Sequence, residues 1–207
     1  MTNTVVEQYF DRLASDWDKY QDCPEDVKRA LLERSGISSG ARILDVACGT
    51  GAITAVLHEL TGEKVKGVDI SGEMIAVARR KFEGNDWAEF EHIDFLDMNE
   101  YGSNKQGEAF KAFEAFDFVV IYNAYPHFLD PRALAKKAHA LLKDGGRLAI
   151  VHSLGRNILN SHHKQHADHV SRPLAAPLEE SNHFADFFDV EIAEEDDAHY
   201  LLVLKKK

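Results

Sequence analysis

The stretch of sequence that decides the fold is Ala41–Gly51, which reads ARILDVACGTG. Its apolar run ends at two glycines, Gly49 and Gly51, and residues 52–60 then resume a helical spacing of apolar side chains. A strand, a glycine turn and a helix in this order are typical of the opening unit of an open α/β sheet. We therefore expect the rest of the chain to alternate strands with helices.

The later segments continue this alternation. Further strands are predicted at 64–69, 88–94, 116–122 and 147–152, with helices at 73–82 and from Pro131 to just before Gly145. Two β-rich runs, 187–193 and 199–204, flank an acidic turn. These patterns predict an α/β fold: a Rossmann-like, doubly wound, mostly parallel seven-stranded sheet with an antiparallel C-terminal hairpin.

The composition is acidic, with 24 Lys and Arg against 35 Asp and Glu and a net charge of -11. Such an excess repels phosphate backbones and anionic lipids, so we expect neither nucleic acid nor a membrane as a partner. Cys23 and Cys48 cannot form a disulfide framework, and no signal peptide or membrane span is recognisable. The sequence therefore predicts a cytoplasmic protein and leaves its oligomeric state open.

Acidic and glycine residues follow the predicted strands, at the edge where such sheets bind their ligands. Asp69 ends the second strand 20 residues after Gly49, where a carboxylate can accept both hydroxyl protons of a ribose. Asp94 ends the third strand, where it can accept a hydrogen bond from an exocyclic amine. Asp45, before the glycine turn, indicates a cationic ligand group instead of a pyrophosphate, so a dinucleotide oxidoreductase is the less favoured alternative.

Several of these segments together resemble the class I S-adenosylmethionine-dependent methyltransferases. The resemblance rests on residues 43–51 (ILDVACGTG), 67–71 (GVDIS), 92–95 (HIDF) and 141–148 (LLKDGGRL). The opening run 9–18 (YFDRLASDWD) is similar to the start of the branch that includes the quinone-biosynthesis methyltransferases.

The resemblance implies S-adenosylmethionine as the cofactor and S-adenosylhomocysteine as the product. It assigns the methionyl end of the cofactor to Asp45, Ala47, Gly49 and Gly51, the ribose hydroxyls to Asp69, and the adenine to Ile70, Asp94 and Phe95. Ala47 stands where many members of the family have glycine.

The segment after the fourth strand, residues 122–128 (YNAYPHF), is expected to lie next to the transferred methyl group. It is not the Asp/Asn-Pro-Pro-Tyr/Phe signature of enzymes that methylate amino groups of nucleic acids, which favours a small-molecule acceptor. Asn123 and His127 are the catalytic candidates, with Tyr125 behind them. In the opening segment, Trp17 and Tyr20 are predicted lid residues that close the site against water.

Histidines are unusually frequent, with 11 in the chain and a cluster between residues 152 and 183. A helix over 157–170 would place His162 and His166 in a stripe that faces the site and binds the acceptor, with His163 in the adjacent row. His152, at the end of the fifth strand, is the third catalytic candidate. The i, i+4 spacing of His162 and His166 also suits a shared divalent metal ion, so a metal cofactor is an open alternative.

We predict one domain over 1–207, with an N-terminal helical lid (1–36), a cofactor-binding core (37–153), a helical cap (154–186) and the terminal hairpin (187–207). Its predicted function is transfer of a methyl group from S-adenosylmethionine to a small molecule. One alternative is a methyltransferase that depends on a metal, or acts on a metal-bound substrate, through the cap histidines. A further alternative is a protein that binds the cofactor without catalysis.

Overall fold

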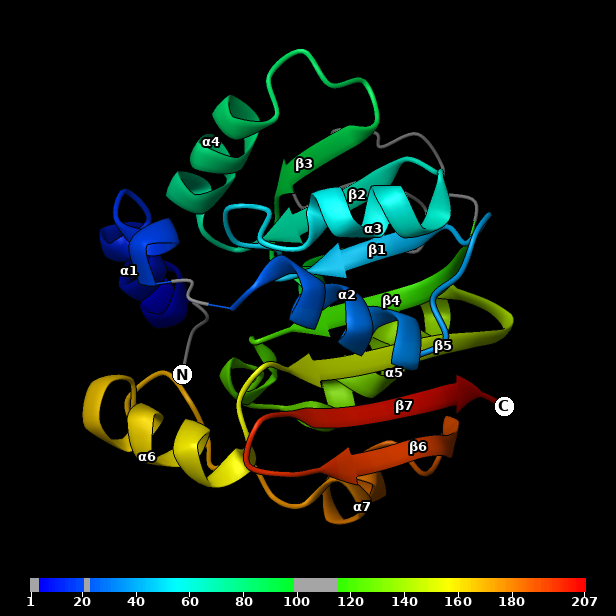
Figure 1. The fold of residues 1–207 in the computed structure, drawn as a ribbon. Helices are drawn as coiled ribbons and strands as arrows, with labels where there is room; N and C mark the ends of the chain where they lie inside the picture. Colours follow the sequence, from blue (N-terminus) through cyan, green and yellow to red (C-terminus); the bar gives the residue numbers. More distant parts are fainter. Residues whose placement is uncertain (1–3, 21–22, 99–114) are drawn as a thin grey trace.

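One mixed sheet organises the molecule. The computed structural model describes residues 4–20, 23–98 and 115–207, and within them seven strands pair in the order β3-β2-β1-β4-β5-β7-β6 (Figure 1). Strands β1 to β5 are parallel, and β7 is antiparallel to both β5 and β6. This topology confirms the predicted fold class. The strands are β1 (Ile43–Val46), β2 (Val65–Asp69), β3 (Ala88–His92), β4 (Phe116–Tyr122), β5 (Leu142–His152), β6 (Phe188–Glu195) and β7 (Tyr200–Lys206).

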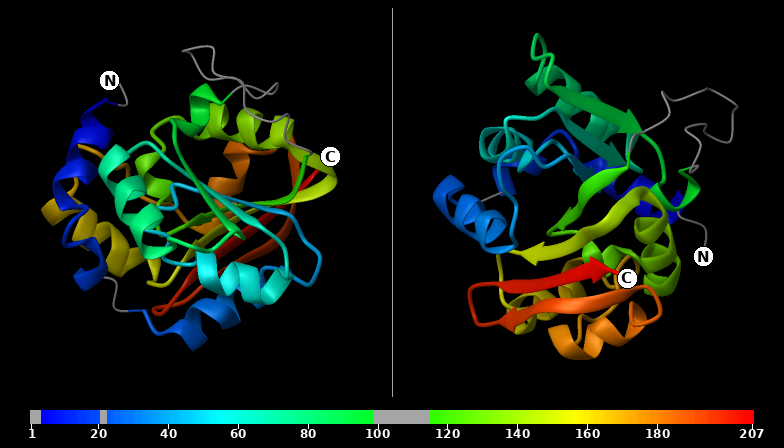
Figure 2. Two further views of the ribbon diagram at one scale, coloured as in Figure 1. Left: turned by 90° about the horizontal axis from the view of Figure 1, so that it is seen from above. Right: turned by 90° about the vertical axis from the view of Figure 1, so that its right-hand side faces the viewer.

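Helices cover both faces of this sheet (Figure 2). The α-helices are α1 (Thr4–Leu13), α2 (Glu25–Arg34), α3 (Thr54–Thr61), α4 (Gly72–Lys81), α5 (Pro131–Leu141), α6 (Arg156–His166) and α7 (Pro177–Glu180). Short 3-10 helices are η1 (Trp17–Tyr20), η2 (Phe95–Asp97), η3 (Tyr125–His127) and η4 (Ser181–His183).

The two faces of the sheet form separate apolar cores because successive residues of a strand point to opposite sides. In β1, Ile43 packs with α2 and α3, whereas Leu44 packs with α5 and α6. All residues of β1 and β2 are buried, as expected for parallel strands covered on both faces. The carboxyl ends of β1, β2 and β4 therefore open onto one common edge.

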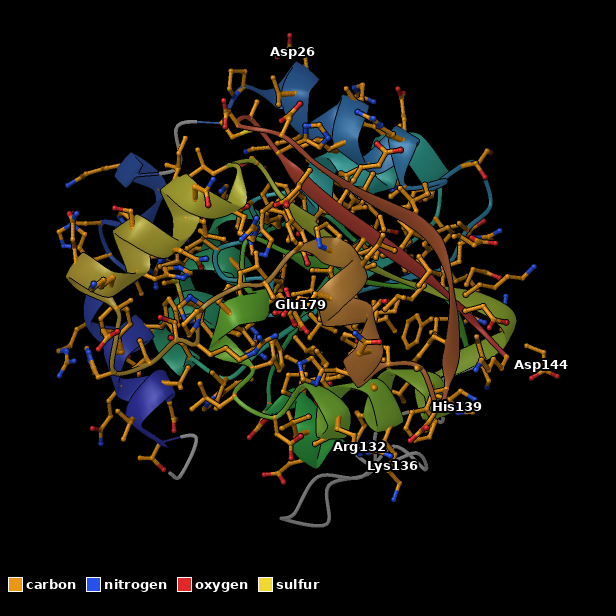
Figure 3. The ribbon with its side chains drawn as sticks, turned by 90° about the horizontal axis from the view of Figure 1, so that it is seen from below. Asp26, Arg132, Lys136, His139, Asp144 and Glu179 are labelled. Atoms are coloured by element: carbon orange, nitrogen blue, oxygen red, sulfur yellow. The ribbon has the colours of Figure 1, made fainter. Side chains whose placement is uncertain are left out.

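Helix α5 begins where the sequence predicts and covers the sheet with one apolar face. The side chain of Asp130 accepts hydrogen bonds from the N–H groups of Arg132 and Ala133, at 3.1 and 2.9 Å, and Pro131 occupies the first turn. Figure 3 shows Arg132, Lys136 and His139 at helical spacing along this helix, opposite its buried side.

Helix α6 is shorter than predicted, and this changes which histidines it presents. The sequence predicts a helix over 157–170, but α6 ends at His166, so His169 lies beyond it. Leu159 and His163 are its buried residues, whereas Ile158 and His162 are exposed. The buried stripe is therefore the row of His163, and the expectation that the stripe of His162 and His166 faces inward is wrong. The two rows differ by one residue, and only packing against the sheet selects between them.

A buried ion pair fastens the segment after α6 to the loop that follows β4. Arg172 makes two 2.8 Å hydrogen bonds to the Glu180 carboxylate, which also accepts from the Tyr125 hydroxyl at 2.8 Å and from the Ala175 N–H. The Arg172 guanidinium lies 4.6 Å from the centre of the Tyr125 ring. Although burial raises the pKa of Glu180, these hydrogen bonds hold it below its ordinary value. Glu180 is therefore charged and paired.

No helix within residues 4–20, 23–98 and 115–207 combines the length and the apolar character needed to cross a bilayer.

Replacement of Glu180 by alanine is expected to destabilise the protein by about 3–5 kcal/mol, because it leaves a largely buried guanidinium without its partner. The control is Arg132→Ala, which breaks the exposed pair of Arg132 with Asp186 and should cost at most about 1 kcal/mol. Urea unfolding of both variants measures the difference. Equal losses would show that the pair of Arg172 with Glu180 contributes no more than a surface contact.

Candidate active site

A cavity of about 380 Å³ lies at the carboxyl ends of β1, β2 and β4, between the sheet and α1. Many of the residues predicted from the sequence line it, although they come from five different parts of the chain. These lining residues are Trp17, Ala47, Gly49, Asp69, Ile70, Asp94, Phe95, Asn123 and His127.

The turn after β1 forms one wall of the cavity and depends on left-handed backbone. Ala47, Gly49 and Gly51 have φ angles of 56°, 55° and 80°. A side chain at Gly49 would point towards the indole nitrogen of Trp17, 3.7 Å from its Cβ position, so Trp17 lies over the turn. A Cβ at Gly51 would come within 2.7 Å of the Phe82 ring, so Gly51 shapes the turn from behind and is not in the lining.

Ala47 adopts the left-handed conformation with a side chain. This conformation costs a residue other than glycine roughly 1–2 kcal/mol. The glycine that is common in the resembling family would remove that cost. The surrounding strand, turn and helix therefore impose the backbone path at this position.

Two acids occupy neighbouring strand ends beside the turn. The Asp69 carboxylate accepts from the N–H groups of Gly49 and Ser71, both at 2.8 Å. Asp45 is 1% exposed and lies behind the lining, where its Oδ2 accepts a long, 3.5 Å hydrogen bond from Thr54. Its Oδ1 has no hydrogen-bond partner among the residues that the structure describes.

The environment of Asp45 and Asp69 disfavours the ionised form of each carboxyl group. Burial, and then the nearby Asp69 carboxylate, raise the pKa of Asp45 to about 8. Burial also raises the pKa of Asp69 to about 6, although the N–H groups of Ser71 and Gly49 oppose the rise. The pair therefore favours a ligand group that brings positive charge and hydrogen-bond donors.

The third strand end supplies the far part of the wall. The Asp94 side chain accepts a hydrogen bond from the Leu96 N–H at 3.0 Å and caps η2. Ile70 and Phe95 line the cavity on either side of it. This part is mainly apolar with one carboxylate at its edge, which suits a flat, weakly polar ring.

The N-terminal segment docks onto the cavity through acids that bind the loops. Asp11 accepts from the Ser71 hydroxyl at 2.6 Å, and Asp18 accepts from the Thr50 hydroxyl at 2.5 Å. Phe10 packs edge-on against Trp17 and also against His127, with ring centres 5.6 and 4.9 Å apart. Tyr20 ends η1, but its side chain lies outside the part of the chain that the structure describes.

His127 stands at the opposite end of the cavity from the two acids. Its Nδ1 lies 2.9 Å from the Val170 carbonyl, which can only accept, so Nδ1 carries the proton and Nε2 the lone pair. Burial lowers the pKa of His127 to about 4. The ring is therefore neutral near pH 7.

Asn123 lines the cavity but its side chain is already occupied. Its amide nitrogen donates to the Ser153 hydroxyl, and its amide oxygen accepts from the Ser153 N–H, each at 2.9 Å. Its φ angle is 54°, which places it in the left-handed region. This geometry favours a role in shaping the loop after β4.

The remaining predicted residues lie outside the lining. The Tyr125 side chain is fully buried and hydrogen-bonded to Glu180, and the His152 side chain is fully buried. His162 and His166 are exposed on α6, with ring centres 4.9 Å apart. Across the described residues, no group of three or more His, Cys, Asp or Glu side chains is arranged to hold a metal ion.

Sequence reasoning missed the apolar wall beside His127. Val6 and Phe10 belong to the apolar stripe of α1, a pattern that predicts burial but does not name the surface it buries. Phe128 belongs to the segment 122–128 already singled out after β4, and Leu129 follows it directly. Only the docking of α1 across the strand ends assigns these side chains to the cavity.

The fold and the cavity together define an open α/β domain whose cavity lies at the switch between β1 and β4, where such sheets bind their ligands. A family model described as "Methyltransferase domain" matches residues 44–148, about half of the chain. The chain belongs to this methyltransferase family, which confirms the class predicted from the sequence.

Individual relatives agree with this assignment. The chain is similar to a demethylmenaquinone methyltransferase of Lactococcus lactis, with 32% identity over 156 residues that cover 70% of this chain and 57% of that protein. It spans about half the length of the curated relatives it matches.

Two solved structures share the fold. One is the putative methyltransferase in complex with the Trm112 activator of Haloferax volcanii, with 20% identity, 97% of each chain covered and a TM-score of 0.76. The other is magnesium protoporphyrin IX methyltransferase from Synechocystis with bound SAH, with 18% identity, 99% of each chain covered and a TM-score of 0.68.

Replacement of Asp45 by asparagine tests the burial of this carboxyl group. An unfolded chain loses the Asp45 proton near pH 4, whereas the folded protein keeps it to about pH 8. The folded state therefore binds more protons between these values, and the contribution of Asp45 to stability falls as the pH rises. The melting temperature of Asp45→Asn minus that of the parent should accordingly increase between pH 5 and pH 8. A difference that does not change with pH would show that the folded protein leaves the pKa of Asp45 unshifted.

Proposed function

We propose that the cavity binds S-adenosylmethionine and that the protein transfers its methyl group to a small molecule. The observation that carries this proposal is the pair of buried acids, Asp45 and Asp69, beside a left-handed turn. A buried carboxylate oxygen without a donor, next to a second carboxylate, gains from a cationic ligand and repels a pyrophosphate. An ammonium group and ribose hydroxyls fit this set of acceptors.

The residues that hold the cofactor follow from their places around the cavity. Asp69 would accept the ribose hydroxyls. A bound cationic group lowers the pKa of a neighbouring carboxyl, so Asp45 would lose its proton and balance the positive methionyl end. Ile70 and Phe95 would enclose the adenine, with Asp94 at its edge. Trp17 lies over Gly49 and covers the turn. When bound, S-adenosylmethionine supplies an activated methyl group that an aligned nucleophile displaces.

The acceptor would occupy the end of the cavity near His127. The walls there are apolar, from Val6, Phe10, Phe128 and Leu129. Demethylmenaquinone methyltransferases among the relatives support an acceptor with an apolar ring. We infer that the lid residues position this acceptor and exclude water, while His127 offers the lone pair of Nε2.

Replacement of Asp69 by alanine is expected to weaken S-adenosylhomocysteine binding about 10- to 100-fold, because the ribose hydroxyls lose a buried charged acceptor. Titration calorimetry measures this affinity. The matched control is Asp86→Ala, which removes an exposed carboxylate from the turn before β3 and should bind as the parent does. An unchanged affinity in Asp69→Ala would contradict the ribose contact.

The methyl transfer itself is tested by screening small molecules with isotope-labelled S-adenosylmethionine and detecting labelled products by mass spectrometry. Labelled product that requires the protein supports the proposal. Tight binding of S-adenosylhomocysteine without any product from a broad panel of phenols, thiols and amines would favour a binding protein without catalysis. Tight NAD binding without affinity for S-adenosylhomocysteine would overturn the cofactor assignment.

A further inference from the structure

A group of three imidazoles lies behind the acceptor end of the cavity. His127 comes from η3, His152 from the end of β5 and His163 from the buried side of α6. The ring centres of His127 and His163 are 5.1 Å apart, and His152 lies within electrostatic range of both rings. Three chain segments far apart in sequence thus bring their histidines to one place.

Several polar atoms of this group lack partners although they are buried. Both ring nitrogens of His152, Nδ1 of His163 and the Tyr200 hydroxyl have no hydrogen-bond partner within the described part of the chain. His152 and Tyr200 are fully buried, and their ring centres are 5.7 Å apart. Buried polar atoms in folded proteins are almost always satisfied, and ordered water is the usual partner where protein groups do not reach.

At rest near pH 7 the three rings are neutral and offer lone pairs. Burial is the main cause that lowers the pKa of each ring, to about 4 for His127 and about 3 for His152. The titratable groups that act on the three rings are the rings themselves and His162, and the Tyr200 ring lies edge-on to that of His152. Since Nδ1 of His127 is bound to Val170, its Nε2 is the nitrogen that can exchange a proton with the cavity.

We propose that His127, His163 and His152 form a water-linked imidazole relay that takes up the proton a methyl acceptor loses. This inference rests on the proposed methyl transfer and specifies its acceptor as a phenol, thiol or amine that carries a removable proton. His127 is the catalytic residue because it faces the cavity, and His163 and His152 act through it as positioning residues.

Methylation of such an acceptor releases one proton, which the relay takes up. A bond forms between the acceptor heteroatom and the methyl carbon, and the bond from that carbon to the cofactor sulfur breaks, with its electron pair left on sulfur. The acceptor proton moves to Nε2 of His127, and from there through water to Nδ1 of His163. The positive charge of the sulfonium is replaced by one positive charge on the relay.

The first test uses the protein without any acceptor. Nitrogen-15 NMR of the imidazoles should show His127 protonated at Nδ1, together with magnetisation transfer from the His152 and His163 rings to long-lived water. In His163→Asn the pKa of His127 should rise by roughly half a unit, because the neighbouring ring that lowers it is lost. The control is His139→Asn, on α5 and remote from the cavity, which should leave the pKa of His127 unchanged (Figure 3).

The relay would be overturned if the His152 and His163 rings showed no magnetisation transfer to long-lived water. It would also be overturned if the pKa of His127 were the same in His163→Asn as in the parent. Calorimetry with S-adenosylhomocysteine on the same variants separates this result from a failure of the proposed function, since His163→Asn should keep the parent's affinity within about twofold. With an acceptor found by screening, the acid limb of kcat/KM should move to higher pH in His163→Asn and not in His139→Asn. A sulfonium or quaternary ammonium product, which forms without loss of a proton, would also contradict the proposal.

Discussion

The burial of two carboxylates at adjacent strand ends is the constraint on which the rest of the site depends. β1 and β2 are parallel neighbours, so Asp45 and Asp69 come together at one edge of the sheet. The Asp69 carboxylate is stabilised by the Ser71 N–H, and by the Gly49 N–H because the chain turns sharply after β1. That turn needs left-handed backbone at residues 47, 49 and 51, and it exposes the Thr50 hydroxyl to Asp18 of the lid. This wall of the cavity, the turn and the docking place of the N-terminal segment are thus consequences of one local requirement.

Local sequence patterns predicted this half of the site because its parts are local. A strand, a turn and a helix lie within about twenty residues. Asp45 and Asp69 lie at the carboxyl ends of two strands, so their positions are known once the strands are predicted. The bounds of β4 match the prediction because a strand covered on both faces is a continuous apolar run. The same patterns could not show that Gly51 faces Phe82, or that the Asn123 amide is bonded to Ser153. Nor could periodicity choose the row of His163 over the adjacent row of His162, because both rows have helical spacing.

The part of the cavity around His127 is assembled from contacts between distant segments. The Tyr9 hydroxyl donates to the His166 carbonyl and so joins α1 to the end of α6. His127 is held by the Val170 carbonyl, and Tyr125 by Glu180, so the loop after β4 depends on the segment that follows α6. Each contact spans more than forty residues of sequence. Composition and local spacing do not predict contacts between distant segments. The sequence therefore showed the large number of histidines but not how their side chains are arranged in the fold.

Burial acts in opposite directions on the two ends of the cavity, and the result is a nearly neutral interior. It raises the pKa values of Asp45 and Asp69 to about 8 and about 6, and it lowers those of His127 and His152 to about 4 and about 3. At pH 7 burial opposes charge on all four groups, because it favours the neutral form of an acid and of a base alike. S-adenosylmethionine, with its ammonium, sulfonium and carboxylate groups, carries one net positive charge at that pH. A bound cation of this kind would lower the pKa values of Asp45 and Asp69, so the charge of this part of the cavity would depend on the cofactor that we propose.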